Sequence, residues 1–211
     1  MSTDARREQL LDAGVALLRH RPHTEVSIEE IAEAAGVSKG LLYHYFPTKT
    51  EFIVAALERG QEELAARLAP DDSLPPVKRL DASLDAFLDY VEDHPAAFAA
   101  IFRGESESPA IAAVLEAGRG EQLATLLGAL GEWEGAPVSV ERTPELEAAV
   151  QGWLFFVEGA VLHWMENGGE DRDRLRMLLR TALGGAVIAA ATARGEAPRL
   201  DALVGSDQGA A

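Results

Sequence analysis

The sequence predicts an all-α fold of about nine helices, in which a small N-terminal three-helix head is joined through a fourth helix to a larger helical body. Alanine and leucine dominate the apolar residues and β-branched residues are sparse, a composition that favours helices. Apolar residues recur at helical spacing over long stretches, with prolines and glycines between them. With 211 residues, 47% of them hydrophobic, the chain can form one sizeable core or a small domain attached to a larger one.

Several classes of protein are disfavoured by what the sequence lacks. Cysteine is absent, which excludes a disulfide framework, a cysteine nucleophile and a thiolate zinc site. The motifs H-E-x-x-H and G-x-S-x-G and a phosphate-binding glycine loop are missing, so neither an enzyme nor a cofactor is expected. His20 and His23 lie in a charged turn, where no metal site is expected. The polar N-terminus and the lack of 18 consecutive apolar residues predict a soluble, cytoplasmic protein.

The negative charge is unevenly distributed along the chain. The formal net charge of −16 by itself argues against binding to nucleic acid, because neutralisation of phosphates supplies much of the affinity for DNA. Residues 1–50 carry six basic and seven acidic residues, a net charge of −1, whereas the remainder carries 13 basic and 28 acidic residues. This asymmetry suits a molecule that meets a polyanion with its N-terminal end and keeps an acidic body soluble.

The first two helices are predicted from apolar spacing and from caps. Apolar residues at helical spacing predict a helix over residues 3–20, which Pro22 closes. A shorter second helix spans residues 27–35, because Ser27 and Glu30 form an S-x-x-E capping box directly before an apolar repeat. The head therefore begins with a long helix followed by a short, well-capped one.

A tight turn leads into the third helix. Gly36 is expected to end the second helix as a left-handed residue, and Ser38 can cap the next helix only two residues later. The third helix then runs from Lys39 to about Tyr45, and Val37 and Leu42 form a hydrophobic staple across its start. The staple fixes the angle at which the chain enters this helix.

A second capping box opens the connecting helix, and the body follows it. Pro47 ends the third helix, and Thr48 with Glu51 begins a fourth helix over residues 48–69. We therefore expect a first domain at residues 1–50 and a second at residues 70–211. The body is predicted to contain helices over residues 77–93, 95–102, 109–130, 144–166 and 171–194.

The second and third helices, with the tight turn between them, have the spacing of a helix-turn-helix, in which the second helix of the pair enters the major groove of DNA. Helical hairpins in ordinary cores share this spacing, so evidence for DNA binding must also come from the side chains. Lys39 and Lys49 both occupy first-turn positions, where the helix macrodipole disfavours a cation. A DNA phosphate at each helix start would remove the conflict, and the alternative is a pair of solvated surface lysines.

The third helix also has more large side chains than a small core can hold. Residues 43–45 are Tyr, His and Tyr, and three consecutive positions project around more than half of a helix, so some of them must be exposed. Leu42 and Phe46 are the natural inward pair. Gly40 costs about 1 kcal/mol relative to Ala inside a helix, and close approach of DNA to the backbone would explain its presence.

The segment from Val26 to Phe52, VSIEEIAEAAGVSKGLLYHYFPTKTEF, resembles the DNA-binding signature of the TetR family. The resemblance covers roughly residues 6–57, and beyond them only the layout of nine helices is shared. Two departures are Leu41, where the family often has a small hydroxyl residue, and an Arg-Pro-His turn at residues 21–23 in place of one containing glycine. The resemblance implies contacts of Thr24 and Ser27 with the DNA backbone, of Ser38, Lys39, Gly40, Leu41 and His44 with base edges, and of Tyr43, Tyr45 and Lys49 with phosphates.

By this resemblance the chain is expected to be a repressor that binds a pseudo-palindromic operator as a homodimer and is released by a small, largely apolar effector. Family members typically dimerise through their last two helices, and small residues there would let backbones approach, while a helix hairpin buried within one subunit is the alternative. The residues expected at this interface are Leu175, Leu178, Leu179, Ala182, Ala186, Ala189, Ala190, the pair Gly184 and Gly185, and Gly152 and Gly159 of the preceding helix.

Aromatic residues of the body are candidates for lining an effector cavity, although aromatics at helical spacing are more often plain core. The candidates are Phe87, Tyr90, Phe98, Phe102, Trp153, Phe156, His163 and Trp164. Glu158 is a lone carboxylate in an apolar helix, so it could bind the effector, pair with Arg103 or His163, or face water, and the last is the simplest.

A second function of a different class remains open. The near-neutral charge of the head also suits a helical small-molecule-binding protein or co-regulator that does not bind an operator itself. Salt-dependent binding to duplex DNA separates these two possibilities.

Overall fold

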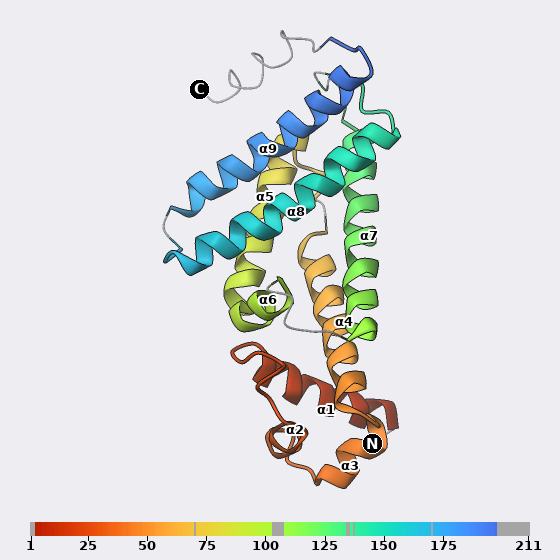
Figure 1. The fold of residues 1–211 in the computed structure, drawn as a ribbon, viewed down its shortest axis with the longest axis vertical. Helices are drawn as coiled ribbons and strands as arrows, with labels where there is room; N and C mark the ends of the chain where they lie inside the picture. The colour runs from red at the N-terminus through yellow and green to blue at the C-terminus, as the bar shows by residue number, and fades with distance from the viewer. Residues whose placement is uncertain are drawn as a thin grey trace. The chain divides into compact units, whose positions relative to one another are not determined.

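A computed structural model describes residues 3–69, 71–102, 108–133, 136, 138–169 and 171–197. Over these residues the fold is all-α, as predicted (Figure 1). The helices begin and end within two residues of the predicted bounds. They are α1 (Thr3–Leu18), α2 (Ile28–Ala34), α3 (Lys39–Tyr45), α4 (Lys49–Arg67), α5 (Pro76–Asp93), α6 (Pro95–Phe102), α7 (Pro109–Gly131), α8 (Pro144–Glu166) and α9 (Arg172–Ala193).

The chain divides into two compact units. The first contains Met1–Ala69 and Asp85–Gly118, and the second contains Pro70–Leu84 and Arg119–Ala211. Helices α5 and α7 therefore each contribute one part to either unit. The two units are described separately below.

The core of the head, within the first unit, is built from α1 to α4. Leu10, Ile31 and Leu42 are completely buried, and each fully buried side chain of this size contributes about 1.5–3 kcal/mol of transfer free energy. The ring of Phe52 packs against α1 at Gly14, where an added Cβ would lie 2.1 Å from a ring carbon. The absence of a side chain on α1 therefore lets α4 begin close to the head.

Further along α4, contacts within the same unit join it to α5. The hydroxyl of Tyr90 donates to the carbonyl of Gly60 at 3.1 Å, and burial raises the pKa of Tyr90 to about 12, so this donor stays protonated. His94 is buried, stacks on Tyr90 at 4.3 Å and has its Nε2 3.8 Å from a carboxylate oxygen of Glu63. The end of α5 is thus fixed to the middle of α4.

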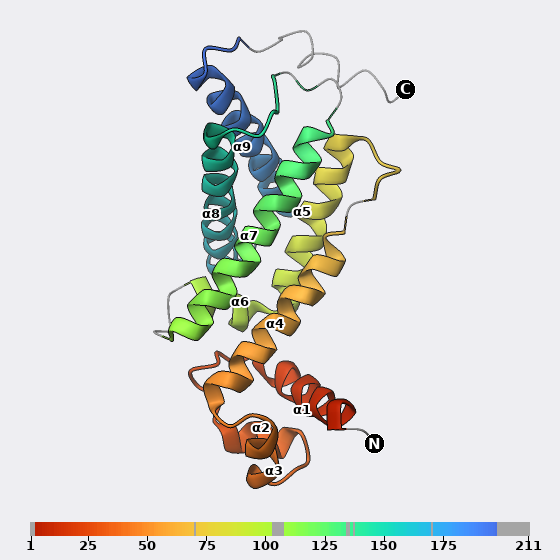
Figure 2. The ribbon, with the colours of Figure 1, turned by 90° about the vertical axis from the view of Figure 1, so that its right-hand side faces the viewer.

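The second unit is organised around α8 and α9, which run antiparallel and side by side (Figure 2). Their contact buries apolar residues from both helices, among them Val150, Val157 and Leu183. The indole Nε1 of Trp153 donates to the backbone carbonyl of Leu179 at 2.8 Å, which satisfies the polar atom of this buried ring.

Candidate nucleic-acid interface

The start of α2 is fixed by the predicted capping box. The hydroxyl of Ser27 accepts from the backbone N–H of Glu30 at 3.2 Å, and the carboxylate of Glu30 accepts from the backbone N–H of Ser27 at 2.8 Å. Glu30 also pairs with Arg21 at 2.6 Å. The hydrogen bond from Arg21, together with those from Ser27, lowers the pKa of Glu30 to about 2, so the box is intact at neutral pH.

The turn between α2 and α3 also follows the prediction. Gly36 has a φ of 65°, and the backbone N–H of Val37 donates to the carbonyl of Ala32 at 2.9 Å, which closes the end of α2. Ser38 caps α3 by accepting from the backbone N–H of Leu41 at 3.2 Å. These local bonds set the direction of α3 before any packing is considered.

Helix α3 has one inward side and one outward side. Leu42 is fully buried, and Phe46, which follows the helix, is 1% exposed and contacts Phe52 edge to face at 5.0 Å. This confirms the predicted inward pair. The residues on the exposed surface are Ser38, Lys39, Gly40, Tyr43 and His44, while Leu41 and Tyr45 are half-buried.

The remaining predicted contacts lie near the starts of α2 and α4. Thr24 is exposed, whereas Ser27 and Lys49 are half-buried. The hydroxyl of Ser27 donates to Glu30 at 2.8 Å, so its proton is already engaged. The hydroxyl of Ser38 acts as an acceptor in its capping bond, which leaves its proton available to a phosphate or a base edge.

No contact within the described residues explains why position 40 is a glycine. An added Cβ at this position would meet no described atom within 4 Å, so packing inside the head does not require glycine there. The approach of another molecule to this part of α3 therefore remains the prediction for Gly40.

Lys39 has a partner that sequence reasoning missed. Its ammonium hydrogen-bonds the carboxylate of Glu29 on α2 and lies 5.7 Å from the ring centroid of Tyr43. The predicted conflict between Lys39 and the helix dipole is therefore relieved by Glu29 in the unbound protein. Glu29 is ten residues away, and only its place in the first turn of α2 hinted at this role.

The turn after α1 carries less positive charge than its composition suggests. Arg21 pairs with Glu30 and also donates to the carbonyl of Glu25 at 2.9 Å. The positive charge of Arg21 is therefore largely neutralised, and its two bonds hold the turn against the start of α2.

Comparisons with known proteins agree with this geometry. Residues 10–56 match the family model for bacterial regulatory proteins of the tetR family, and residues 76–184 match the C-terminal domain of tetracyclin repressor-like proteins. The chain belongs to the TetR family of transcriptional regulators. A tetR-family regulator from Streptomyces coelicolor has a similar structure, with a TM-score of 0.77 and 31% identity over 92% of this chain and 85% of that one.

Two relatives extend the similarity at the level of sequence. An HTH-type transcriptional regulator of Mycobacterium tuberculosis is 33% identical over 66% of this chain and 69% of its own length. The HTH-type transcriptional activator FasR of Mycolicibacterium smegmatis is 35% identical, but the match spans only 48% of this chain and 48% of FasR. The helix-turn-helix of α2 and α3 lies inside residues 10–56, the segment that matches the tetR family model.

Four of the predicted effector residues lie in the first unit of this TetR-family protein. The ring of Phe98 contacts Phe87 at 6.0 Å and Phe102 at 4.5 Å between ring centroids. Tyr90 bonds to α4, as described above. Phe87, Phe98 and Phe102 therefore form one aromatic group, whereas Tyr90 stacks on His94 and bonds to α4.

The other predicted effector residues lie along α8 in the second unit and do not share one face. Trp153 is buried, Trp164 is half-buried, and Phe156 and His163 are exposed. Trp153 therefore lies on the side of α8 that packs against α9, whereas Phe156 and His163 lie on its exposed side.

Glu158 does not face water, so the simplest expectation for this carboxylate is wrong. Its side chain is only 13% exposed and pairs with Nε of Arg119 at 3.1 Å, whereas sequence reasoning considered Arg103, which lies outside the described residues, or His163. Burial raises the pKa of Glu158, while Arg119 opposes the shift. Arg119 also lies 5.3 Å from the ring centroid of Phe155, so the pair borders the exposed part of α8.

The residues expected on one dimerisation face divide between two sides of α9. Leu175, Leu179 and Ala190 are buried inside the unit, which corrects their predicted place at an interface. Gly184, Gly185 and Ala189 are exposed, as are Gly152 and Gly159 on α8. Four large apolar side chains are also exposed on these helices, and we call them the α8–α9 face: Phe155 (53%), Phe156 (41%), Met177 (56%) and Leu178 (51%).

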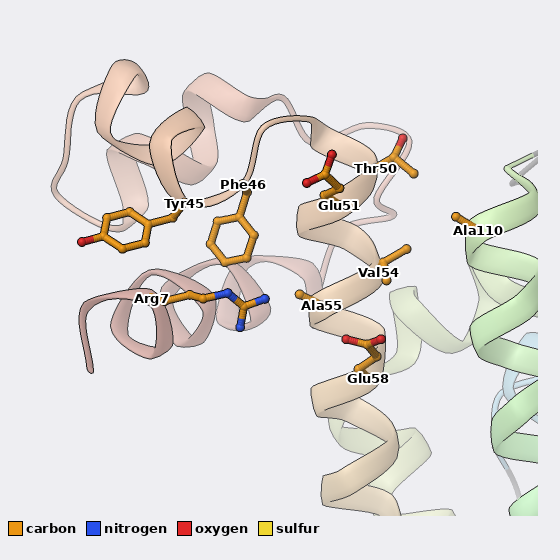
Figure 3. Close-up of a pocket in the computed structure, with 9 residues that line it drawn as sticks. All are labelled: Arg7, Tyr45, Phe46, Thr50, Glu51, Val54, Ala55, Glu58 and Ala110. Carbon is orange, nitrogen blue, oxygen red and sulfur yellow. The ribbon is translucent and has the colours of Figure 1, made fainter. Parts of the chain in front are cut away.

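A pocket of about 280 Å³ lies in the first unit beside the end of α3 (Figure 3). It is lined by none of the predicted effector residues. Arg7 stacks over the ring of Phe46 at 4.9 Å on one side, and Glu51 and Glu58 of α4 line another. The remaining lining residues are Tyr45, Thr50, Val54, Ala55 and Ala110.

Proposed function

We propose that this regulator is a repressor that binds a pseudo-palindromic operator as a homodimer and is released by a small, largely apolar effector. The observation that carries the proposal is the division of α3 into a buried side and a polar exposed side. The recognition surface, which we define as Ser38, Lys39, Gly40, Tyr43 and His44, offers hydroxyl, ammonium and imidazole groups. Such groups suit the phosphate oxygens and base edges of a major groove.

Each residue of this surface has a proposed role. Ser38, Lys39, Gly40 and His44, with the apolar Leu41, would lie against base edges, and Leu41 would contact a thymine methyl group. Tyr43, Tyr45 and Lys49 would contact phosphates, as would the exposed Thr24. A contact from Ser27 is less favourable, because its hydroxyl proton is bonded to Glu30.

The homodimer is proposed from the α8–α9 face. Exposed apolar patches mark interaction sites, and glycines exposed beside these side chains would let a second copy approach closely. A two-fold dimer presents two recognition helices to successive major grooves, which is why the operator should be pseudo-palindromic. Helix α9 is also long and apolar enough to cross a membrane by length and composition, but its packing on α8 within the same chain supports a helix of a cytoplasmic protein.

Effector release is proposed to act through α4. We assign DNA reading to residues 1–50, connection to residues 48–69, and effector sensing and dimerisation to residues 70–211. An apolar molecule that displaced Tyr90 from the carbonyl of Gly60 would free the middle of α4, whose first turn carries Lys49. The effector needs only to favour the non-binding form by a few kcal/mol to release the operator.

The test begins with selection of bound duplexes from a random pool, followed by fluorescence anisotropy with and without a panel of apolar compounds. Tight, salt-dependent binding to a two-fold symmetric sequence supports the proposal. Unchanged affinity and salt slope in Lys49→Ala and Tyr43→Phe would overturn the DNA contacts. A ligand that binds without changing operator affinity would overturn effector release.

The sign of regulation is a separate part of the experiment, since the FasR relative is named an activator. A dimer that covers a promoter represses without contacting any protein, and this simple steric effect is what we propose. In vitro transcription from a promoter that overlaps the selected operator should decrease when the protein is added. An increase would show an activator.

The second candidate is a helical binding protein or co-regulator that does not bind an operator. It is favoured by the pairing of Lys39 with Glu29 and of Arg21 with Glu30, which neutralises two of the positive charges of the head. The same selection experiment decides, because such a protein would enrich no duplex at low salt.

A further inference from the structure

An ion pair between α2 and α3 includes Lys39, a residue of the recognition surface. Lys39 is the first residue of α3, and its ammonium bonds the Glu29 carboxylate in the first turn of α2. Both side chains are about half exposed, at 51% for Lys39 and 57% for Glu29. The contact lowers the pKa of Glu29 and raises the pKa of Lys39, so both groups are charged at neutral pH.

Within the described residues, Glu29 is the one carboxylate of α2 paired with α3. Glu30 is engaged by Arg21 and Ser27, and Glu33, one turn after Glu29 on the same side of α2, is exposed and has no ion-pair partner within the described part of the chain. Lys49 offers a contrast, because the described part of the chain gives it no ion-pair partner either. The two lysines at neighbouring helix starts therefore differ in ion pairing, since Glu29 pairs with Lys39 and no described carboxylate pairs with Lys49.

Glu29 supplies to Lys39 what a DNA phosphate would supply. A cation in the first turn opposes the helix macrodipole, and a nearby anion relieves this conflict. In the unbound head the anion is Glu29. Exposed ion pairs contribute little to stability, so a DNA oxygen can replace the carboxylate at small cost to the head.

We propose that Glu29 is a specificity-determining residue that competes with DNA for Lys39 and thereby weakens sequence-independent binding more than operator binding. The inference rests on the proposed function. In a non-specific complex Lys39 acts only as a charge near phosphates, and Glu29 cancels that charge. At the operator, α3 is seated in the groove, and the ammonium meets an acceptor in a fixed position, so the carboxylate competes poorly.

The expected effects follow from counterion release. For each head in contact with a scrambled duplex, Glu29→Gln should steepen the slope of log affinity against log salt by about one, because one further phosphate contact releases about 0.9 of a counterion. This corresponds to about eightfold tighter non-specific binding per bound head at about 0.1 M salt. Operator affinity should increase less than about twofold per head, so the ratio of specific to non-specific affinity should decrease at least about fourfold per head.

The experiment compares the wild type, Glu29→Gln, Glu33→Gln, Lys39→Gln and the double variant Glu29→Gln/Lys39→Gln on operator and scrambled duplexes between about 50 and 200 mM salt. Glu33→Gln removes the same charge from the same side of α2 without breaking the ion pair, so it should change non-specific binding less. The effect of Glu29→Gln should disappear when Lys39 is also replaced.

Three results would overturn the inference. They are equal effects of Glu29→Gln and Glu33→Gln, persistence of the Glu29→Gln effect without Lys39, and equal gains on both duplexes. These failures differ from failure of the proposed function, in which the wild-type protein itself binds no selected duplex.

Discussion

The recognition surface of α3 and the α8–α9 face expose opposite kinds of side chain. On α3 the large apolar residues Leu42 and Phe46 point into the head, and polar groups remain outside. On α8 and α9 apolar residues occupy both sides, since Val157 and Leu183 are buried while Phe156 and Leu178 are exposed. A helix with one apolar side can bury all of it in its own domain. A helix with two apolar sides leaves one exposed to water, and this surface can be buried by a partner.

This difference supports the binding partners proposed for the two surfaces. Phosphates and base edges are polar, so a surface of hydroxyl and cationic groups can meet them without losing solubility when unbound. A second copy of the α8–α9 face is apolar, and burial of apolar surface drives such an association. The charge distribution separates the two roles further, because the net charge outside residues 1–50 is −15 and repels DNA phosphates.

The largest expected effect is on dimerisation. Leu178→Asp places a charge at an exposed position, so each chain should fold normally but become monomeric. Operator affinity should then decrease on the order of 1000-fold, because the second recognition helix is no longer linked to the first. Light scattering and fluorescence anisotropy measure the two quantities. Ala124→Asp, at an exposed alanine of α7, should change neither, and a dimeric Leu178→Asp protein with normal affinity would contradict the assignment of this face.

The second effect is on the stability of the head, and it distinguishes buried from half-buried positions of α3. Leu42→Ala removes a fully buried side chain and should lower the free energy of unfolding of the head by about 3 kcal/mol. Leu41→Ala, at the half-buried neighbour, should cost less than about 1 kcal/mol. Urea denaturation followed by circular dichroism measures both. Similar costs at the two positions would show that the inward side of α3 is wrongly assigned.

The parts of the molecule that follow local rules could be predicted from the sequence. The caps at Ser27, Ser38 and Thr48 and the left-handed Gly36 depend only on residues within three or four positions along the chain. The inward position of Leu42 follows from helical phase. These rules predicted the head almost completely.

Interactions between helices could not be predicted in the same way. The pairs Lys39–Glu29 and Glu158–Arg119 join residues 10 and 39 positions apart, and they depend on how helices pack. For α9, apolar residues occupy more than one side, so periodicity alone could not show that Leu175 points inward and Leu178 outward. A sequence pattern identifies an apolar helix but not which of its sides the same chain covers.

A smaller effect on operator affinity is expected at Lys49. Replacing Lys49 and, as a control, Lys78 compares a lysine near the recognition surface with a lysine of the body. For each bound subunit, Lys49→Ala should lower operator affinity about eightfold at about 0.1 M salt and reduce the salt slope by about one, because one phosphate contact per subunit is lost. Lys78→Ala removes the same charge from the first turn of α5 and should leave both quantities unchanged. Equal effects of the two variants would indicate that Lys49 acts through net charge alone.

The smallest effect concerns the pH dependence of the head. The pKa of Glu30 is lowered to about 2, chiefly by Arg21, so this carboxylate stabilises the fold above its ordinary pKa and loses that contribution as pH decreases toward 2. Glu30→Gln should therefore lower the melting temperature of the head at neutral pH, and the difference from the wild type should shrink below pH 4.5. Thermal melts over this range test the prediction, with the exposed Glu33→Gln as the control. A constant difference at every pH would mean that the variant acts by altering the capping box geometry and not through the charge of Glu30.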